Sequence, residues 1–549
     1  MSQNNEFETS PVVPQNLQPA RHFAASYAGE HVAGTEFVIG AMFVAWGVGT
    51  SDILWGLLWG NLLAVLTWAF ICAPIATDTR LTLYAYLQRI AGKGTIKIYS
   101  IVNGVLFCIL AGAMVTVSAS AVRILFDIPP QVNWYPTDFR FVLVSLLVGA
   151  VVVVIAIKGF RRVAQFAEVC APWMILMFIA GALALYPSLR AATAEVNGTA
   201  SVDFFAVADQ FIWQGDKSDL SVWHVAAFAW ICNLAMHGGL SDMTILRFAR
   251  RYQYGFFSAL GMFIGHYLAW VCAGIMGAGA ALLLQSSITQ LDAGAVAFEA
   301  LGIAGILAVI IAGWTTSNPT IYRAGLAFHS LNPKWSRVKV TALTGIATTI
   351  IACFPFVFSR LMDFVGLMGL LLAPVGAIIV TEHWLFPKFG FSRYWSHYKK
   401  QLINIPAITA WLSSLLLALA LNYMGLHLYF LLLPCWLAAT FVYTLMAALM
   451  GARQTYAEAK ILDDAEQERK VAELEFLNTH QEPLEVKTQQ GKLSLVYGLI
   501  AIISLMASVG LAVWVFNGGE LSVFKQWLWL PTLIYFAFAL LWASVKERA

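Results

Sequence analysis

Two apolar segments of this chain are broken where a membrane helix would be continuous. The segment from about His22 to Trp46 contains the run GEHVAGTE at 29–36, and the segment from about Trp223 to Leu246 contains NLAMHGG at 233–239. Lipid offers unsatisfied backbone groups no partner, and a charge at the bilayer centre costs roughly 2.5 kcal/mol or more. Such breaks persist where they line a wet cavity enclosed by protein. Because they fall at corresponding places in two halves of the chain, they predict one binding cavity between them.

The composition sets the fold class. Of 549 residues, 60% are hydrophobic and 11% are charged, whereas a soluble domain carries about 25% charged residues. We expect an all-α integral membrane protein. Apolar runs near the length of a bilayer-spanning helix predict about fourteen spans. These lie near 24–46, 52–75, 97–126, 138–157, 164–186, 222–245, 254–285, 299–328, 340–358, 362–385, 404–424, 427–450, 493–517 and 524–545.

The basic residues predict the orientation. With the N-terminus in the cytoplasm, about 26 of the 33 Lys and Arg residues fall on the cytoplasmic side, where such residues are retained. The chain is therefore expected in the cytoplasmic (plasma) membrane as a multi-pass protein with both termini cytoplasmic. The net charge of +3 sums a basic inner and a more acidic outer face, so it does not indicate nucleic acid binding.

The sequence lacks the motifs of several classes of protein. The seven cysteines lie in apolar spans without a CxxC pair, and no phosphate-binding loop or nucleophile motif occurs. We therefore expect neither an enzyme nor a bound cofactor, and no feature sets the oligomeric state. The predicted organisation is a disordered tail at 1–21, a transport core at 22–390, helices 11 and 12 at 391–451, a charged cytoplasmic segment at 452–492, and two extra membrane helices at 493–549. The charged segment is expected to form a solvated helical connector.

A family resemblance appears in the eighth span. Residues 314–328, WTTSNPTIYRAGLAF, resemble the Trp-Thr-Thr-Asn, Leu-Tyr and Gly-Leu-x-Phe pattern of cytosine permeases in the nucleobase:cation symporter-1 family. Three other places are similar to that family's motifs: Gly60-Asn61, the run RFAR at 247–250, and PVGAII at 374–379. Together these motifs extend over residues 22–390. Sodium:solute symporters, in the same superfamily, share a break like the one in the first span.

The resemblance implies a fold and an ion site. The fold is a core of two inverted five-helix repeats whose first helices, spans 1 and 6, are broken, with sodium and a planar nucleobase bound between the repeats. By similarity, sodium would be held by the carbonyls of Gly29, Val32 and Gly313 and the hydroxyls of Thr315 and Thr316. The alternative for the two threonines is hydrogen bonding to carbonyls of their own helix.

The substrate pocket departs from the family pattern. Phe107 stands where the family places a tryptophan, Ala235 where it has a stacking aromatic, and His237 where it has small or hydroxyl residues. We therefore expect a less flat and more polar pocket. The candidate substrate-binding residues are Glu30, His31, Ala33, Gly34, Glu36, Phe107, Ala235, His237, Gly238 and Asn318.

The ionisable residues of the breaks leave two interpretations open. Glu30, His31, Glu36 and His237 together would suit a proton relay or a cationic, donor-rich solute. Alternatively, one of the two glutamates forms a structural ion pair with a basic group such as Arg123 or with His31. Arg323 is expected to cap or snorkel near a span end, and His266 to be a core histidine.

The sequence as a whole predicts an ion-coupled symporter that imports a small polar, nitrogen-containing solute such as a nucleobase by alternating access. Sodium is the expected coupling ion. The alternatives are a proton-coupled carrier of an amine, amino acid or vitamin, and a channel or receptor on the same scaffold. The expected partners are the small-molecule substrate and the lipid bilayer.

Overall fold

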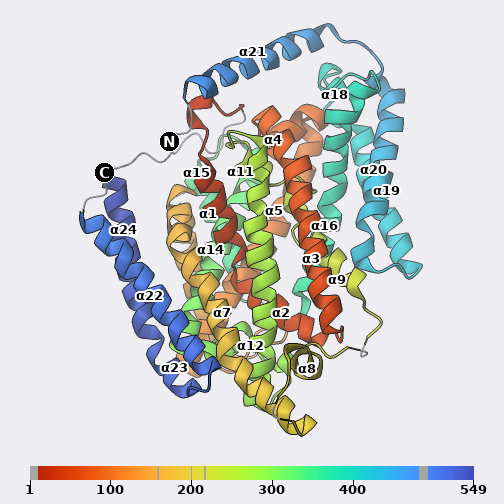
Figure 1. The fold of residues 1–549 in the computed structure, drawn as a ribbon. Coiled ribbons are helices and arrows are strands. Elements are labelled where there is room, and N and C mark those ends of the chain that lie inside the picture. Colours follow the sequence, from red (N-terminus) through yellow and green to blue (C-terminus); the bar gives the residue numbers. More distant parts are fainter. Residues whose placement is uncertain (1–9, 158–159, 200, 216–217, 481–491, 549) are drawn as a thin grey trace.

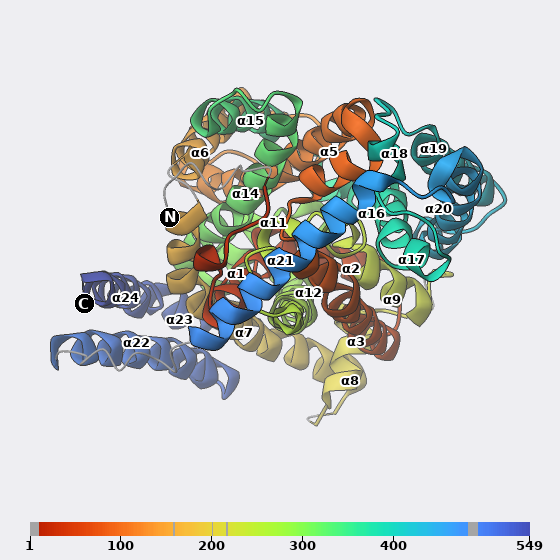
Figure 2. The ribbon, with the colours of Figure 1, turned by 90° about the horizontal axis from the view of Figure 1, so that it is seen from above.

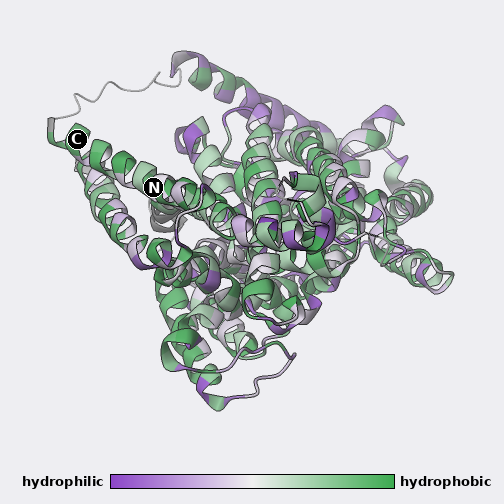
Figure 3. Ribbon diagram, turned by 60° about the horizontal axis from the view of Figure 1, so that its bottom comes forward, coloured by the Kyte–Doolittle hydropathy of each residue, from purple (hydrophilic) through white to green (hydrophobic). Residues whose placement is uncertain are grey.

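The computed structural model describes residues 10–157, 160–199, 201–215, 218–480 and 492–548, with the backbone alone at 160–168, 492 and 546–548. These residues form a bundle of helices with no β-sheet, as predicted, and the apolar residues cover the bundle (Figures 1 and 3).

The first half of the core follows the predicted order of spans. Its helices are α1 (Ala20–His31), α2 (Gly34–Ala45), α3 (Thr50–Thr67), α4 (Ala73–Thr79), α5 (Leu83–Val122), α6 (Phe139–Ile157) and α7 (Phe160–Asn197). A π-helical segment, η3 (Trp68–Cys72), joins α3 to α4. A short helix, α8 (Phe204–Val207), leads to the second half.

The second half begins with another interrupted segment. It comprises α9 (Val222–Ile231), α10 (Leu234–His237), α11 (Met243–Leu246), the π-helical η7 (Leu260–Leu268), α12 (Ala269–Leu283), α13 (Ala293–Leu301), α14 (Ile303–Leu331), α15 (Arg337–Ala352) and α16 (Val357–Val380). Beyond it lie α17 (Phe386–Lys388), α18 (Trp395–Tyr398), α19 (Ile405–Tyr423), α20 (Leu432–Ala447), α21 (Ala457–Thr479), α22 (Lys492–Phe516), α23 (Leu521–Trp527) and α24 (Trp529–Arg548).

Fewer than fourteen of the described helices have the full length of a membrane span. Among the described residues, 11 helical stretches are long and apolar enough to cross a bilayer. The two interrupted segments fall short because the breaks divide them, leaving 34–45 and 222–231 as shorter apolar helices. The predicted span 340–358 corresponds to α15, which has only 16 residues. The count of fourteen is therefore not confirmed, although an apolar helix lies in each predicted span.

Close helix packing brings the two halves together. The long helix α5 of the first half packs along α14 of the second half. Gly313 allows this approach, since a Cβ there would lie 2.0 Å from Ser118 Oγ and 2.6 Å from the Met114 carbonyl oxygen. Gly376 does the same for α16, where a Cβ would lie 1.8 Å from the carbonyl oxygen of Gly238. Contacts this close exclude any larger residue at either position.

The helix α21 lies across one end of the bundle, the end at which α1 begins (Figures 1 and 2). It is polar along its length (Figure 3), and ion pairs connect Glu466, Lys470 and Glu473 to residues of the bundle. The predicted charged helix is present, but it is more than a solvated connector. Residues 481–491 of the predicted segment lie outside the described residues.

Part of the predicted disordered tail packs against the bundle. Residues 1–9 of the predicted disordered tail lie outside the described residues. From residue 10 the chain is packed: Val12 and Leu17 are buried, the Val12 amide donates to the Arg80 carbonyl at 3.0 Å, and the Gln18 amide donates to the Phe248 carbonyl at 2.8 Å. Two buried apolar side chains and these backbone bonds account for the order.

Candidate functional site

Both predicted helix breaks are present. Between α1 and α2, Val32 has φ −91° and ψ 68° and Ala33 is extended, so the helix stops for these two residues. Between α9 and α11 the chain turns twice, and Leu240 adopts a left-handed φ of 62°. Gly34 begins α2 in a tight position, because a Cβ there would lie 2.8 Å from Val117 Cγ1.

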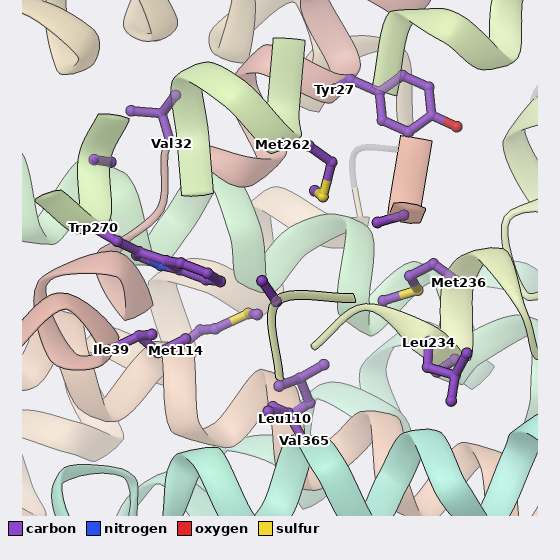
Figure 4. Close-up of a cluster of buried hydrophobic side chains, with 14 of the residues drawn as sticks. Tyr27, Val32, Ile39, Leu110, Met114, Leu234, Met236, Met262, Trp270 and Val365 are labelled. Carbon is purple, nitrogen blue, oxygen red and sulfur yellow. The ribbon is translucent and has the colours of Figure 1, made fainter. Parts of the chain in front are cut away.

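A small cavity of about 40 Å³ lies between the two breaks. Drug-sized ligands occupy pockets of roughly 300–1,000 Å³, so this conformation encloses the site in a contracted form. Apolar side chains form much of the wall, including Ile39, Leu110, Met114, Met236 and Val365 (Figure 4). The polar lining residues are Glu30, His31, Thr35, Glu36, Asn233, His266, Thr316 and Thr320.

Glu36 is a buried carboxylate held by neutral donors. Its side chain is 3% exposed; it accepts hydrogen bonds from the indole N–H of Trp270 and, at 3.3 Å, from the Thr35 hydroxyl. His266 Nε2 lies 3.8 Å from its Oε1. Among the described residues no Arg or Lys pairs with Glu36. A carboxylate buried without a matching cation is poised to take up a proton or a positively charged group.

Two histidines complete the polar wall. The His266 ring stacks on Trp270 with centroids 4.3 Å apart, and its Nε2 lies 3.3 Å from the Asn233 amide nitrogen. The His31 ring meets that of His266 at 5.3 Å, and its Nδ1 lies 2.9 Å from the Tyr27 carbonyl oxygen. Because a carbonyl only accepts, this contact places a proton on His31 Nδ1 and leaves Nε2 as the other polar atom of the ring.

Glu30 has a different environment from Glu36. The guanidinium of Arg323, which is 1% exposed, donates to both Glu30 carboxylate oxygens, one of them at 3.0 Å, and to Asp242 Oδ1 at 2.6 Å. The other oxygen of Asp242 accepts from Tyr27 Oη and Trp68 Nε1, both at 2.8 Å. Glu30 therefore forms a structural ion pair. Its partner is Arg323, which is buried within α14 instead of capping a span end, while Arg123 pairs with Asp292.

The structure brings only part of the predicted substrate set together. Glu30, His31 and Glu36 line the cavity, with Ala33 and Gly34 in the break beside them. The other five residues are absent from the lining: Phe107, Ala235, His237, Gly238 and Asn318.

Three of these five have partners elsewhere. His237 Nε2 lies 2.9 Å from the Trp230 carbonyl oxygen, and the ring packs against Trp68 with centroids 4.8 Å apart. The Asn318 amide donates to the carbonyl of Trp314 at 2.8 Å, and Gly238 packs against Gly376.

Two of the predicted sodium ligands, Thr315 and Thr316, lie in α14, and Thr316 contacts the end of α1. Thr316 Oγ1 donates to the carbonyls of Ala312 at 2.9 Å and Glu30 at 3.2 Å, so it joins α14 to the end of α1. Thr315 Oγ1 donates to the Ala312 carbonyl at 3.1 Å. Both threonines thus make the within-helix bonds considered as the alternative. Each hydroxyl oxygen still has lone pairs for an ion, and the oxygen-only set of Gly29, Val32, Gly313 and the two threonines suits a hard cation.

Sequence reasoning missed several residues of this region. Asn233 and His266 line the cavity, and Asp242 and Arg323 form the ion-pair network beside it. Asn233 lies in the break motif, and Asp242 and Arg323 are opposite charges within apolar spans, which gave a usable indication. The sequence around His266 gave no such indication, because only the packing of η7 against α1 brings this residue to the break.

Comparisons with known proteins support the fold. No family model and no curated protein matches the sequence. Among solved structures, Mhp1, a nucleobase-cation-symport-1 family transporter, in a closed conformation with bromovinylhydantoin bound, aligns with a TM-score of 0.62 and 14% identity over 84% of this chain and 98% of that chain. Its inward-facing conformation aligns with a TM-score of 0.61, 14% identity and coverage of 84% of this chain and 96% of that one.

A substrate-bound, outward-open Na+-coupled sialic acid symporter is also similar, with a TM-score of 0.52 and 13% identity over 79% of this chain and 90% of that chain. At these identities the likeness establishes the fold. The predicted core of two inverted five-helix repeats with broken first helices is confirmed.

Proposed function

We propose that this protein is a cation-coupled symporter that carries a small polar, nitrogen-containing solute across the membrane by alternating access. The observation that carries the proposal is the cavity between the two broken helices, in which Glu36 is buried without an Arg or Lys partner among the described residues. A transporter on this fold binds its solute and coupling ion between the repeats, where the broken helices expose backbone groups.

The chemistry of the cavity supports a solute rich in N–H donors. Glu36 is a hydrogen-bond acceptor, the two histidines can accept or donate, and the Asn233 amide can do both. The stacked pair of His266 and Trp270 provides an aromatic surface beside them. Nucleobases and hydantoins have such donors and a flat ring, and the solved Mhp1 structure holds bromovinylhydantoin. A nucleobase or a related heterocycle is therefore the proposed class of solute.

Sodium is the proposed coupling ion, at the oxygen atoms of Gly29, Val32, Gly313, Thr315 and Thr316. The Thr316 contact with the Glu30 carbonyl supports this, because it brings hydroxyl and carbonyl oxygens of both repeats together. A structurally similar symporter is sodium-coupled. Proton coupling is the second candidate, and the buried Glu36 favours it, since its carboxylate has only neutral donors and His266 near it.

The proposal is tested by measuring solute uptake into proteoliposomes that contain the purified protein. Radiolabelled nucleobases, hydantoins, amino acids and amines are offered with a sodium gradient, a proton gradient or neither. We expect one heterocycle to accumulate with the sodium gradient, and Glu36→Gln to abolish this uptake. The matched control is Asp292→Asn, which alters a buried carboxylate outside the cavity.

If uptake depends on the proton gradient alone, the coupling ion is a proton and not sodium. Absence of gradient-driven accumulation for every solute would overturn the proposal. Counterflow distinguishes a carrier from a channel, because only alternating access exchanges labelled solute against a saturating opposite concentration.

The proposed location is the cytoplasmic membrane, with α21 and both termini in the cytoplasm. The distribution of Lys and Arg supports this orientation. A reporter fused after Ala549 should be active only in the cytoplasm.

A further inference from the structure

The ion-pair network at Arg323 joins three separate parts of the core. Arg323 lies in α14, Glu30 lies at the end of α1, and Asp242 lies immediately before α11. Trp68 of η3 adds a fourth contact through its hydrogen bond to Asp242. All of these side chains are buried, so the network lies within the protein and is closed to solvent in this conformation.

The network lies on one side of the cavity. Glu30 belongs to α1, the half of the first broken helix that precedes the break. Asp242 belongs to the part of the second broken segment that continues to Arg247. The carbonyls of Arg247 and Ala249 accept hydrogen bonds from Arg80, which also pairs with Glu473 of α21. Both carboxylates therefore belong to the helix halves on the side of the N-terminus and α21.

The direct link between Asp242 and Arg323 is a single hydrogen bond. Glu30 binds Arg323 through both of its oxygens, and Asp242 also has Tyr27 and Trp68 as donors. Breaking the one bond between Arg323 Nη2 and Asp242 Oδ1 leaves each charged group with a remaining partner. Removing a whole partner from such a network is far more costly, because it leaves a buried charge uncompensated.

We propose that Arg323, Glu30 and Asp242 form the gate on the N-terminal side of the cavity, and that separation of Asp242 from Arg323 opens the cavity to that side. The inference rests on the proposed transport function. The three residues are positioning residues: they hold the two broken helices against α14.

The native Cys232 reports on this gate, because it lines the cavity. In a protein whose other six cysteines are replaced by serine or alanine, a membrane-impermeant maleimide is applied from the N-terminal side in membrane vesicles of known orientation. We expect slow labelling in the parent protein and labelling faster by at least about tenfold in Asp242→Asn, because weakening the closed state shifts the population toward the open one. Labelling from the opposite side should slow.

The matched control is Asp292→Asn. This substitution also removes a carboxylate from a buried pair with an arginine, but at Arg123, away from the lining of the cavity. Its labelling rate should equal that of the parent. If Asp242→Asn does not fold, Arg323→Lys keeps the charge without the forked geometry and should give an intermediate rate.

The proposal is overturned if the folded gate variants label at the parent rate, or if Asp292→Asn accelerates labelling equally. Because labelling needs no solute, its result is separate from the transport assay. A gate response without transport of any solute contradicts the proposed function alone, whereas transport without a gate response contradicts this inference alone.

Discussion

Glu30 and Glu36 lie on either side of the same helix break, yet their surroundings differ in kind. Glu30 neutralises a buried guanidinium, and Glu36 accepts hydrogen bonds only from neutral groups. Substitution by glutamine therefore has a different expected effect at each position. In Glu36→Gln the amide oxygen can accept the bond from Trp270 while the amide NH2 group donates to the Thr35 hydroxyl. In Glu30→Gln the substitution removes a charge that Arg323 uses.

We predict that Glu30→Gln lowers the free energy of unfolding by about 1.5–3 kcal/mol, the range for a hydrogen bond to a charged group, with Asp242 remaining to neutralise Arg323. Glu36→Gln should leave stability nearly unchanged and abolish transport or its pH dependence. Thermal unfolding and uptake of the two purified variants measure these effects. Equal losses of stability in both would contradict the distinction between them.

A second prediction at this scale concerns sodium. If Thr315 and Thr316 are ligands, replacing both with alanine should abolish the stabilisation by sodium relative to potassium. An ion at 100 times its dissociation constant stabilises a protein by about 2.7 kcal/mol, so the loss is measurable by thermal unfolding. Replacement of Thr344, which also donates to a carbonyl of its own helix, should retain the sodium effect and serves as control. A sodium effect that survives the double substitution would exclude these ligands.

At the scale of elements, α21 is fastened to the bundle by contacts of unequal strength. Glu473 pairs with Arg80, which is 1% exposed, whereas Lys470 pairs with Asp78 at 2.6 Å and both of these side chains are more than 30% exposed. Arg393 binds Glu466 at 3.1 Å. Burial by itself lowers the pKa of Arg393, but Tyr394, Tyr86 and the carboxylates of Glu466 and Asp463 raise the pKa above its usual value. The guanidinium therefore stays charged beneath the helix.

These contacts predict different effects of two single substitutions in α21. Glu473→Gln weakens the neutralisation of a buried guanidinium and should cost about 1.5–3 kcal/mol, while Lys470→Ala removes a partly exposed pair and should cost at most about 1 kcal/mol. Chemical denaturation of the detergent-solubilised variants provides the measurement. If the two costs are the same, the burial of Arg80 does not govern how α21 is held.

At the scale of the whole molecule, the last two membrane helices lie at the edge. The helices α22 and α24 pack against each other and against α7, and none of their residues lines the cavity (Figure 2). By contrast, α21 spans the end of the core from the side of α18 to the N-terminal segment. The two parts that follow α20 thus have different relations to the transport core.

We predict that truncation after His480 lowers the melting temperature but preserves solute binding, because it removes only α22 to α24. Truncation after Gly451 also removes α21 and should cost additional stability, since Arg80 then loses Glu473. Binding of the transported solute and thermal unfolding of both truncated proteins test this. Loss of binding on truncation after His480 would show that the last two helices contribute to the site.

Hydropathy and helix-breaking residues determined much of the fold from the sequence alone. Apolar runs of bilayer length predicted the helices, and glycine and charge within two of them predicted the breaks at Val32-Ala33 and after Asn233. These are local properties, since a segment's partition into lipid and its backbone hydrogen bonding depend on its own residues. The motif at 314–328 extended the prediction to the inverted-repeat core.

Only the tertiary structure decided which ionisable groups meet. Glu30 and Arg323 are remote in sequence, as are Glu36 and Trp270, and nothing in either local pattern selects one partner over another. Local sequence likewise did not show that His237 packs against Trp68 outside the cavity, or that His266 lines the cavity. A pair of buried charges gains or loses several kcal/mol with small changes in distance and solvation. The chain's own residues therefore determine that it forms broken membrane helices, and the packing of α14 and η7 against those breaks determines which residue faces the cavity and which one holds it closed.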